Sequence, residues 1–142
     1  IGLARLEFII SHMIGIHPKA LLEFDKLPQT LQHEISKKIV GYKSPKDFYI
    51  DKLAESIAML AVAFKDKPVI VRMSDFKSNE YANLIGGDRY EPKEENPMLG
   101  YRGAARYIDP GFKDCFELFT VIFSILNNNF FALVFNWFLW CF

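Results

Sequence analysis

The stretch KPVIVRM at 67–73 is the feature that most limits how this chain can fold. Val69, Ile70 and Val71 follow one another, so a strand here has apolar side chains on both of its faces. Such a strand is typical of a parallel sheet that is covered on both sides. Parallel strands need a long connection between them, which is usually helical. The stretch therefore predicts an α/β fold.

A long amphipathic helix is predicted just before this strand, at 44–64. Ser44 is a suitable N-cap, and Pro45 is tolerated at the first helical position because its missing N–H would have no partner there. Apolar residues recur at helical spacing and predict one buried face; they are Ile50, Leu53, Ile57, Leu60, Ala61 and Phe64. A second amphipathic helix is predicted at 28–42, after shorter helical segments at 6–18 and 17–24.

The other predicted elements extend the same alternation. Residues 1–5 indicate the end of a short strand, 101–108 a further strand or strand edge, and 109–118 the start of another helix. Strand, helices and strand in this order form a βα unit, which is the building block of α/β proteins.

A long loop is predicted at 73–100, and loops of this length inside a domain are usually functional. Gly86 and Gly87 lack the strand and helix context of a phosphate-binding loop, so we expect a tight turn there. Glu94 and Glu95 are adjacent carboxylates, and we expect them to be solvated rather than to bind a metal.

The charged residues are unevenly distributed. The net charge is zero, which gives no indication of a nucleic-acid partner. Every charged residue lies at or before Glu117, whereas 119–142 is uncharged and rich in Phe, Asn and Trp. This stretch leaves no polar face for a surface helix, and we expect a hydrophobic, helical tail that does not continue the preceding helix. Three adjacent asparagines near its middle make a membrane span costly.

An arginine stands at the end of each predicted strand: Arg5, Arg72 and Arg102. The carboxyl ends of parallel strands are where α/β proteins bind ligands. A guanidinium group binds phosphate and carboxylate oxygens bidentately and stays charged at any working pH. A surface ion pair would explain any one of these arginines. Together they favour a site for a small phosphorylated or carboxylated metabolite.

The histidines and cysteines show no catalytic or metal-binding pattern. His12, His17 and His33 are expected at the surface. Cys115 and Cys141 form no disulfide framework, which favours a reducing, cytoplasmic location. Nothing basic in the sequence near Cys115 is positioned to lower the pKa of its thiol.

Four segments resemble the PEP-utilising enzymes, at the start of their PEP/pyruvate-binding domain. They are IGLARLEF, VIVRMSDFKSNEYANLIGG, YEPKEENPMLGYRGAARY and FKDCFEL. The resemblance runs from residue 1 to about 118. The loop SDFKSNEYANLIGG is most similar to the pyruvate, water dikinases. Pyruvate, phosphate dikinase and enzyme I of the sugar phosphotransferase system share the three-arginine layout and remain alternatives.

The resemblance implies a (β/α)₈ TIM barrel in the parent enzyme, with two to three βα units in this chain. It implies that Arg5, Arg72 and Arg102 contact the substrate, and that residues 94–103 fix the loop that aims Arg102. The implied reaction converts pyruvate, ATP and water into PEP, AMP and phosphate through a phosphohistidine. The implied parent is a cytoplasmic homo-oligomer that uses Mg²⁺ and binds ATP through another domain, without a nucleic-acid or membrane partner.

The sequence also departs from the family. The metal-binding carboxylates, the proton-transferring cysteine and the phosphohistidine lie outside the matching segment, so no cysteine or histidine of this chain inherits those roles. We expect a PEP/pyruvate-binding portion at 1–118 and a tail at 119–142, and our hypothesis is a truncated or frame-shifted gene fragment that is inactive alone. The alternative from another class is a non-enzymatic protein that the tail anchors to a membrane.

Overall fold

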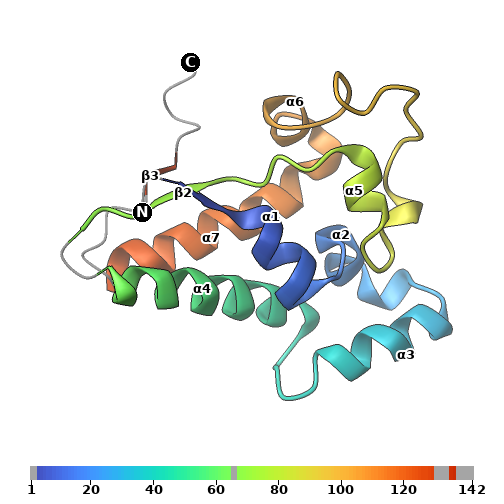
Figure 1. The fold of residues 1–142 in the computed structure, drawn as a ribbon. Coiled ribbons are helices and arrows are strands. Elements are labelled where there is room, and N and C mark those ends of the chain that lie inside the picture. The colour runs from blue at the N-terminus through green and yellow to red at the C-terminus, as the bar shows by residue number, and fades with distance from the viewer. Residues whose placement is uncertain (1–2, 65–66, 130–134, 137–142) are drawn as a thin grey trace.

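Short parallel strands alternate with helices in the computed structural model, which describes residues 3–64, 67–129 and 135–136 (Figure 1). The first half contains β1 (Ala4–Arg5), α1 (Leu6–Ile9), the π-helical turn η1 (Ile10–Ile14), α2 (Pro18–Leu22), the 3-10 turn η2 (Phe24–Lys26), α3 (Gln29–Lys38) and α4 (Pro45–Ala63). The second half contains β2 (Ile70–Arg72), α5 (Ser78–Ala82), the 3-10 turn η3 (Gly87–Arg89), α6 (Ala104–Tyr107), the 3-10 turn η4 (Pro110–Phe112), α7 (Lys113–Asn129) and β3 (Phe135–Asn136).

The strands form one small parallel sheet in the order β1-β2-β3. Ala4 pairs with Val71 and Arg5 with Arg72, while the other edge of β2 pairs with β3. This arrangement confirms a mixed α/β fold that is mostly helical. The closure of a barrel stays a prediction.

Helix α4 agrees closely with the sequence prediction. The Ser44 side chain accepts a hydrogen bond from the Asp47 backbone N–H at 3.1 Å, so the predicted N-cap is present. Leu53 and Ile57 on its predicted apolar face are fully buried. The prediction for Phe64 is wrong, because the helix ends at Ala63 and Phe64, expected on the buried face, is 39% exposed.

The strand predicted at 101–108 is also wrong, because this segment contains α6 and no strand. Gly103 precedes α6 with φ of 55° and ψ of −132°, a conformation that only glycine adopts easily. The chain turns sharply there and cannot continue as an extended strand. In the long loop at 73–100, Gly86 has φ of 76°, which confirms the predicted tight turn.

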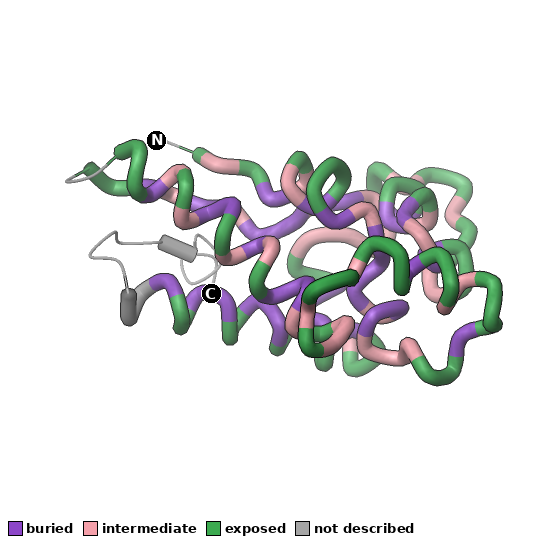
Figure 2. Tube along the Cα trace, turned by 90° about the horizontal axis from the view of Figure 1, so that it is seen from below, coloured by how far each residue is buried: buried purple, intermediate pink, exposed green. Residues whose placement is uncertain are grey.

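Helix α7 runs through residue 118 without interruption and packs along α4 (Figure 1). The expectation that the preceding helix does not continue into the tail is therefore wrong. Phe119 and Ile122 are fully buried while Val121 is 40% and Ile125 38% exposed, so one face of α7 belongs to the core. Figure 2 shows buried and exposed positions alternating along α4 and α7.

Part of the predicted tail, at 130–134 and 137–142, lies outside the described residues. Among the described helices, none is both long enough and apolar enough to cross a bilayer.

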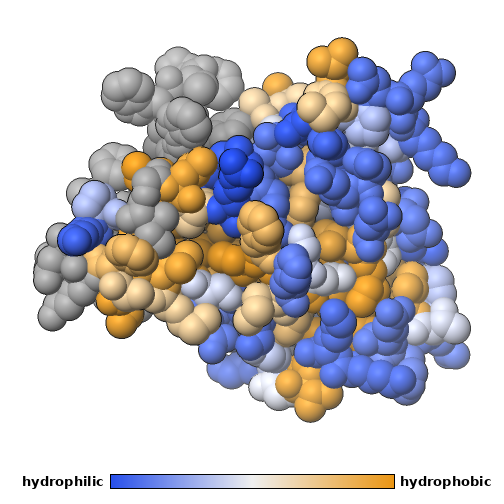
Figure 3. All heavy atoms as spheres, in the orientation of Figure 1, coloured by the Kyte–Doolittle hydropathy of each residue, from blue (hydrophilic) through white to orange (hydrophobic). Residues whose placement is uncertain are grey.

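Apolar side chains gather on the surface where α4 and α7 end, whereas polar side chains cover the opposite end around α3 and α5 (Figure 3). The exposed apolar residues of α4 and α7 are Met59, Val62, Val121 and Ile125. The polar end of the molecule is the end at which strands β1 and β2 lead into α1 and α5 (Figure 1).

Candidate functional site

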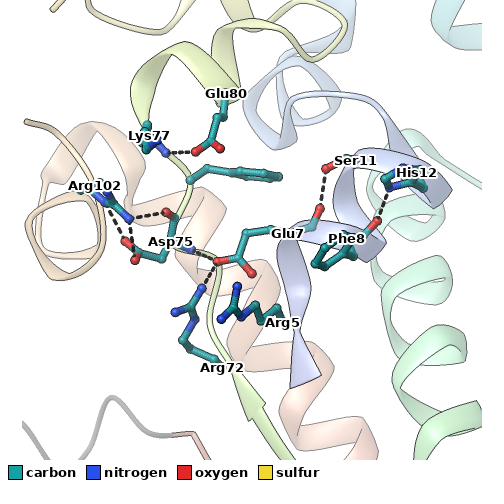
Figure 4. Close-up of a pocket in the computed structure, with 11 residues that line it drawn as sticks. Arg5, Glu7, Phe8, Ser11, His12, Arg72, Asp75, Lys77, Glu80 and Arg102 are labelled. Atoms are coloured by element: carbon teal, nitrogen blue, oxygen red, sulfur yellow. Dashed lines mark hydrogen bonds and ion pairs between the residues drawn. The ribbon is translucent and has the colours of Figure 1, made fainter. Parts of the chain in front are cut away.

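A cavity of about 340 Å³ lies beyond the ends of β1 and β2, and all three predicted arginines line it (Figure 4). Its walls come from β1, α1, η1, β2, the start of the long loop, α5 and the turn before α6. The lining residues are Arg5, Glu7, Phe8, Ser11, His12, Arg72, Asp75, Phe76, Lys77, Glu80 and Arg102.

The parallel register explains why Arg5 and Arg72 lie together. They are paired across β1 and β2, and each is the last residue of its strand. Ion pairs between described residues engage Arg72 and Arg102, whereas none engages Arg5. Arg5 is exposed, so its charge is available to a ligand that enters the cavity.

Glu7 connects the two strand ends. Its Oε1 atom accepts hydrogen bonds from Arg72 Nη2 at 2.6 Å and from the Asp75 backbone N–H at 2.8 Å. Glu7 Oε2 and Arg72 Nε are buried without a protein partner. Buried polar atoms are normally hydrogen-bonded, so these two atoms indicate where a ligand or water is expected.

Arg102 reaches the same cavity from the far end of the long loop. Its guanidinium group donates to Asp75 Oδ1 at 3.1 Å and to Asp75 Oδ2 at 2.8 Å. This planar, bidentate pair fixes both the distance and the orientation of the guanidinium group. Gly103 allows the close approach, because a Cβ atom there would lie 3.2 Å from Asp75 Oδ1.

Glu94 anchors the segment that carries Arg102. Its Oε1 accepts a hydrogen bond from the Tyr101 backbone N–H at 2.7 Å, and its Oε2 accepts one from the Ser78 hydroxyl. The expectation that Glu94 is merely solvated is therefore wrong, whereas Glu95 is exposed as predicted. A carboxylate that holds a loop backbone cannot be distinguished from a solvated one by sequence alone.

His17 is the clearest error among the site predictions, because its side chain is 1% exposed and not at the surface. Its Nδ1 accepts from the Lys19 backbone N–H at 3.1 Å, and its Nε2 lies 3.0 Å from Glu91 Oε1. The available signal was the position of His17 immediately before Pro18, where a side chain can cap a helix. His12 and His33 are exposed as predicted.

Sequence reasoning also missed the role of Arg106. Its guanidinium group forms a buried bidentate ion pair with Glu91, at 2.5 Å to Oε1 and 2.7 Å to Oε2. A strand prediction at 101–108 gave no reason to place this side chain in the interior.

Burial determines the titration of the groups around this cluster. It lowers the pKa of His17 more than the neighbouring Glu91 raises it. Burial alone would raise the pKa of Glu91, but hydrogen bonds from His17 and Arg106 outweigh it and hold that pKa below its usual value. Burial raises the pKa of the Cys115 thiol to about 12, so this cysteine is not an activated nucleophile.

The chemistry that this site supports is anion binding. Among the described residues, no group of three or more His, Cys, Asp or Glu side chains could hold a metal ion. The cavity carboxylates Glu7 and Asp75 are engaged by Arg72 and Arg102. The arginines supply fixed, positively charged hydrogen-bond donors.

Paired parallel strands that end in Arg5 and Arg72 place this chain among the α/β proteins that bind a ligand at the carboxyl ends of their strands. Residues 1–122 match the PEP-binding domain of the PEP-utilising enzymes, and the chain belongs to this family.

Several similar proteins are phosphoenolpyruvate synthases. The chain is 67% identical over 118 residues to the enzyme of Neisseria meningitidis serogroup B, 64% to that of Escherichia coli K12 and 58% to that of Deinococcus radiodurans. Each comparison covers 83% of this chain and 15% of the relative. The chain thus spans about 15% of the length of these relatives.

Proposed function

We propose that this chain forms part of the pyruvate and PEP site of a phosphoenolpyruvate synthase. The whole enzyme converts ATP, pyruvate and water into AMP, PEP and phosphate through a phosphohistidine on another domain, and works in the cytoplasm as a homo-oligomer with ATP bound elsewhere. One observation carries the proposal: Arg5, Arg72 and Arg102 are distant in sequence but line one cavity. The family membership of residues 1–122 supports it.

The charges around the cavity suit a small, multiply charged anion. Arg5, Arg72, Arg102 and Lys77 are cationic, while Glu7, Asp75 and Glu80 are anionic, and four minus three leaves one net positive charge with His12 neutral. A carboxylate or phosphoryl group adds negative charge where the guanidinium groups are already oriented. Such fixed donors also stabilise charge that develops on an enolate oxygen during phosphoryl transfer.

Arg5 is the residue best placed to meet the substrate first. It is exposed and free of the carboxylates that engage Arg72 and Arg102, so binding to it breaks no existing ion pair. Arg72 and Arg102 each share a guanidinium group with one carboxylate and can donate the remaining N–H bonds to the anion.

A magnesium site does not fit the residues described. Of the cavity carboxylates, Glu7 and Asp75 are held by arginines and Glu80 accepts from the Lys77 backbone N–H, and the described residues offer no metal-binding cluster. We therefore propose that the Mg²⁺ of the whole enzyme is held by residues beyond this chain, and derive no step through it.

Calorimetric titration of the purified 142-residue chain tests the proposal. PEP and pyruvate should bind with a stoichiometry near one, and uncharged lactamide should not bind. The chain given ATP, pyruvate and water should form no PEP. Absence of PEP binding by the folded chain would overturn the anion-site proposal, and PEP synthesis by the chain alone would overturn the assignment of the chemistry to other parts of the enzyme.

A further inference from the structure

A buried polar cluster of Arg106, Glu91 and His17 lies outside the cavity. The three side chains come from α6, from the loop after η3 and from the position before α2. Each is about 1% exposed. They are joined by the bidentate Arg106–Glu91 pair and by the His17–Glu91 hydrogen bond.

The charge balance of the cluster follows from its hydrogen bonds. Because His17 Nδ1 accepts from the Lys19 backbone N–H, its proton lies on Nε2, which donates to Glu91. The imidazole is therefore neutral and the cluster holds one positive and one negative charge. The Arg106 guanidinium carbon Cζ lies 4.3 Å from the ring centroid of Tyr81 and 4.2 Å from that of Tyr101. A buried charge pair of this kind is stable only when both partners are held in place.

The cluster reaches the cavity through one peptide segment. Arg106 Nη2 donates to the Tyr101 carbonyl oxygen at 2.9 Å, and Glu94 accepts from the Tyr101 backbone N–H at 2.7 Å. Both backbone polar groups of Tyr101 are thus fixed by ionised side chains. The next residue is Arg102, whose guanidinium group enters the anion cavity.

Resting on the proposed function, we propose that Glu91 and His17 are positioning residues that act through Arg106 and the Tyr101 backbone to hold Arg102 in the anion cavity. Neither lines the cavity. A shift of the Glu91 carboxylate moves the Arg106 fork, and with it the carbonyl of Tyr101 and the direction of Arg102. Small displacements of charged groups are costly in sites of this kind, because the hydrogen bonds to a ligand depend on orientation.

The test uses the full chain with Glu91→Asp, which keeps the charge but withdraws the carboxylate by one methylene. The matched control is Glu95→Asp, because Glu95 is exposed in the same loop. We expect Glu91→Asp to weaken PEP binding roughly fivefold, and Glu95→Asp to leave it unchanged. In an Arg102→Ala background, Glu91→Asp should have no further effect.

A second readout needs no ligand. In the ¹⁵N-arginine spectrum, the Nε–H of Arg102, which donates to Asp75, should be protected from exchange in the wild-type chain and should exchange faster in Glu91→Asp. A failure of the wild-type chain to bind PEP with this protection intact would defeat the proposed function but not the positioning of Arg102.

Two substitutions of His17 provide an independent test. His17→Gln retains a donor toward Glu91 and should bind PEP like the wild type, whereas His17→Phe removes the donor and should weaken binding. This pair carries the test if Glu91→Asp does not fold. Equal loss of affinity in the Arg102→Ala and wild-type backgrounds, or equal affinity of the two His17 variants, would overturn the inference.

Discussion

Two of the three cavity arginines form an ion pair with a neighbouring carboxylate. Glu7 holds Arg72 and Asp75 holds Arg102, so each guanidinium group is aimed before a ligand arrives. Preorganised donors need less reordering on binding, which strengthens the interaction with an anion. The geometry of the guanidinium fork matters here as much as its charge.

Arg102→Lys tests this difference between fork and charge. Lysine keeps the positive charge but cannot form the bidentate pair with Asp75, so we expect PEP binding to weaken by about tenfold. Calorimetric titration measures the change, with Arg89→Lys as the control because Arg89 is exposed and does not line the cavity. Unchanged affinity in Arg102→Lys would show that charge alone suffices.

At the scale of elements, caps and buried faces decide where the helices begin and how they pack. The Ser44 hydroxyl satisfies the Asp47 backbone N–H at the start of α4, and α7 buries Phe119 and Ile122 on its core face. Helix α4 packs against η1 and leads into β2, so its position bears on the strand ends that carry Arg5 and Arg72.

Ser44→Ala should lower the free energy of unfolding by about 1 kcal/mol, because the Asp47 N–H loses its acceptor at the N-cap. Urea unfolding followed by circular dichroism measures the loss. Ser36→Ala is the matched control, since Ser36 is exposed inside α3 and caps nothing. Equal stability of the two variants would contradict the role given to this cap.

Phe119→Ala tests whether α7 is part of the core beyond residue 118. Phe119 is fully buried and contacts Tyr49 edge to face, with ring centroids 5.9 Å apart. We expect a loss of about 3–5 kcal/mol in the free energy of unfolding. Val121→Ala in the same helix is the control, since Val121 is 40% exposed. A similar, small loss in both would mean that this part of α7 does not pack as described.

At the scale of the whole molecule, the buried cluster joins three distant segments of chain and makes stability depend on pH. The folded-state pKa of His17 lies below its ordinary value of 6.5, and that of Glu91 lies below 4.5. The unfolded chain therefore binds more protons than the folded chain when the solution is acidified. The contribution of these two groups to the free energy of unfolding is therefore fully present above about pH 6.5 and falls as the pH is lowered.

We predict that the stability begins to fall at about pH 6.5, by at most about 1.4 kcal/mol per pH unit for each proton involved. His17→Phe should remove the part of this loss that starts near pH 6.5. The part that begins near pH 4.5 and belongs to Glu91 should remain but be smaller, because the hydrogen bond from His17 that helps to lower the pKa of Glu91 is lost. Urea unfolding at pH 8, 6, 5 and 4 measures both effects, with His33→Gln as the control at an exposed position. A pH profile of His17→Phe identical to that of the wild type would refute the assignment.

The sequence predicted the features that local pattern determines. Ser44 with Pro45 marked the start of α4, and the Val-Ile-Val run marked β2. Arg5 and Arg72 could be grouped in advance because the ends of parallel strands meet at one edge of a sheet. Arg102 lines the same cavity, but it lies in the turn before α6 and not at a strand end as predicted. Their part in substrate binding stays a prediction.

The features that depend on contacts between distant residues could not be predicted in the same way. His17 is buried because Glu91, 74 residues further along, accepts its hydrogen bond. Residues 101–108 carry strand-like apolar and aromatic residues, but the conformation of Gly103 and the inward position of Arg106 give a helix instead. The continuation of α7 depends on a core face supplied by α4.

Titration of the ¹⁵N-arginine-labelled chain with PEP, followed by NMR, tests the central claim most directly. The sequence contains five arginines, so each Nε–H signal can be assigned by single substitutions. We predict that the signals of Arg5, Arg72 and Arg102 shift together along one saturable curve, while that of Arg89 does not move. Shifts confined to one of the three, or no saturable shift in any of them, would contradict a shared anion site.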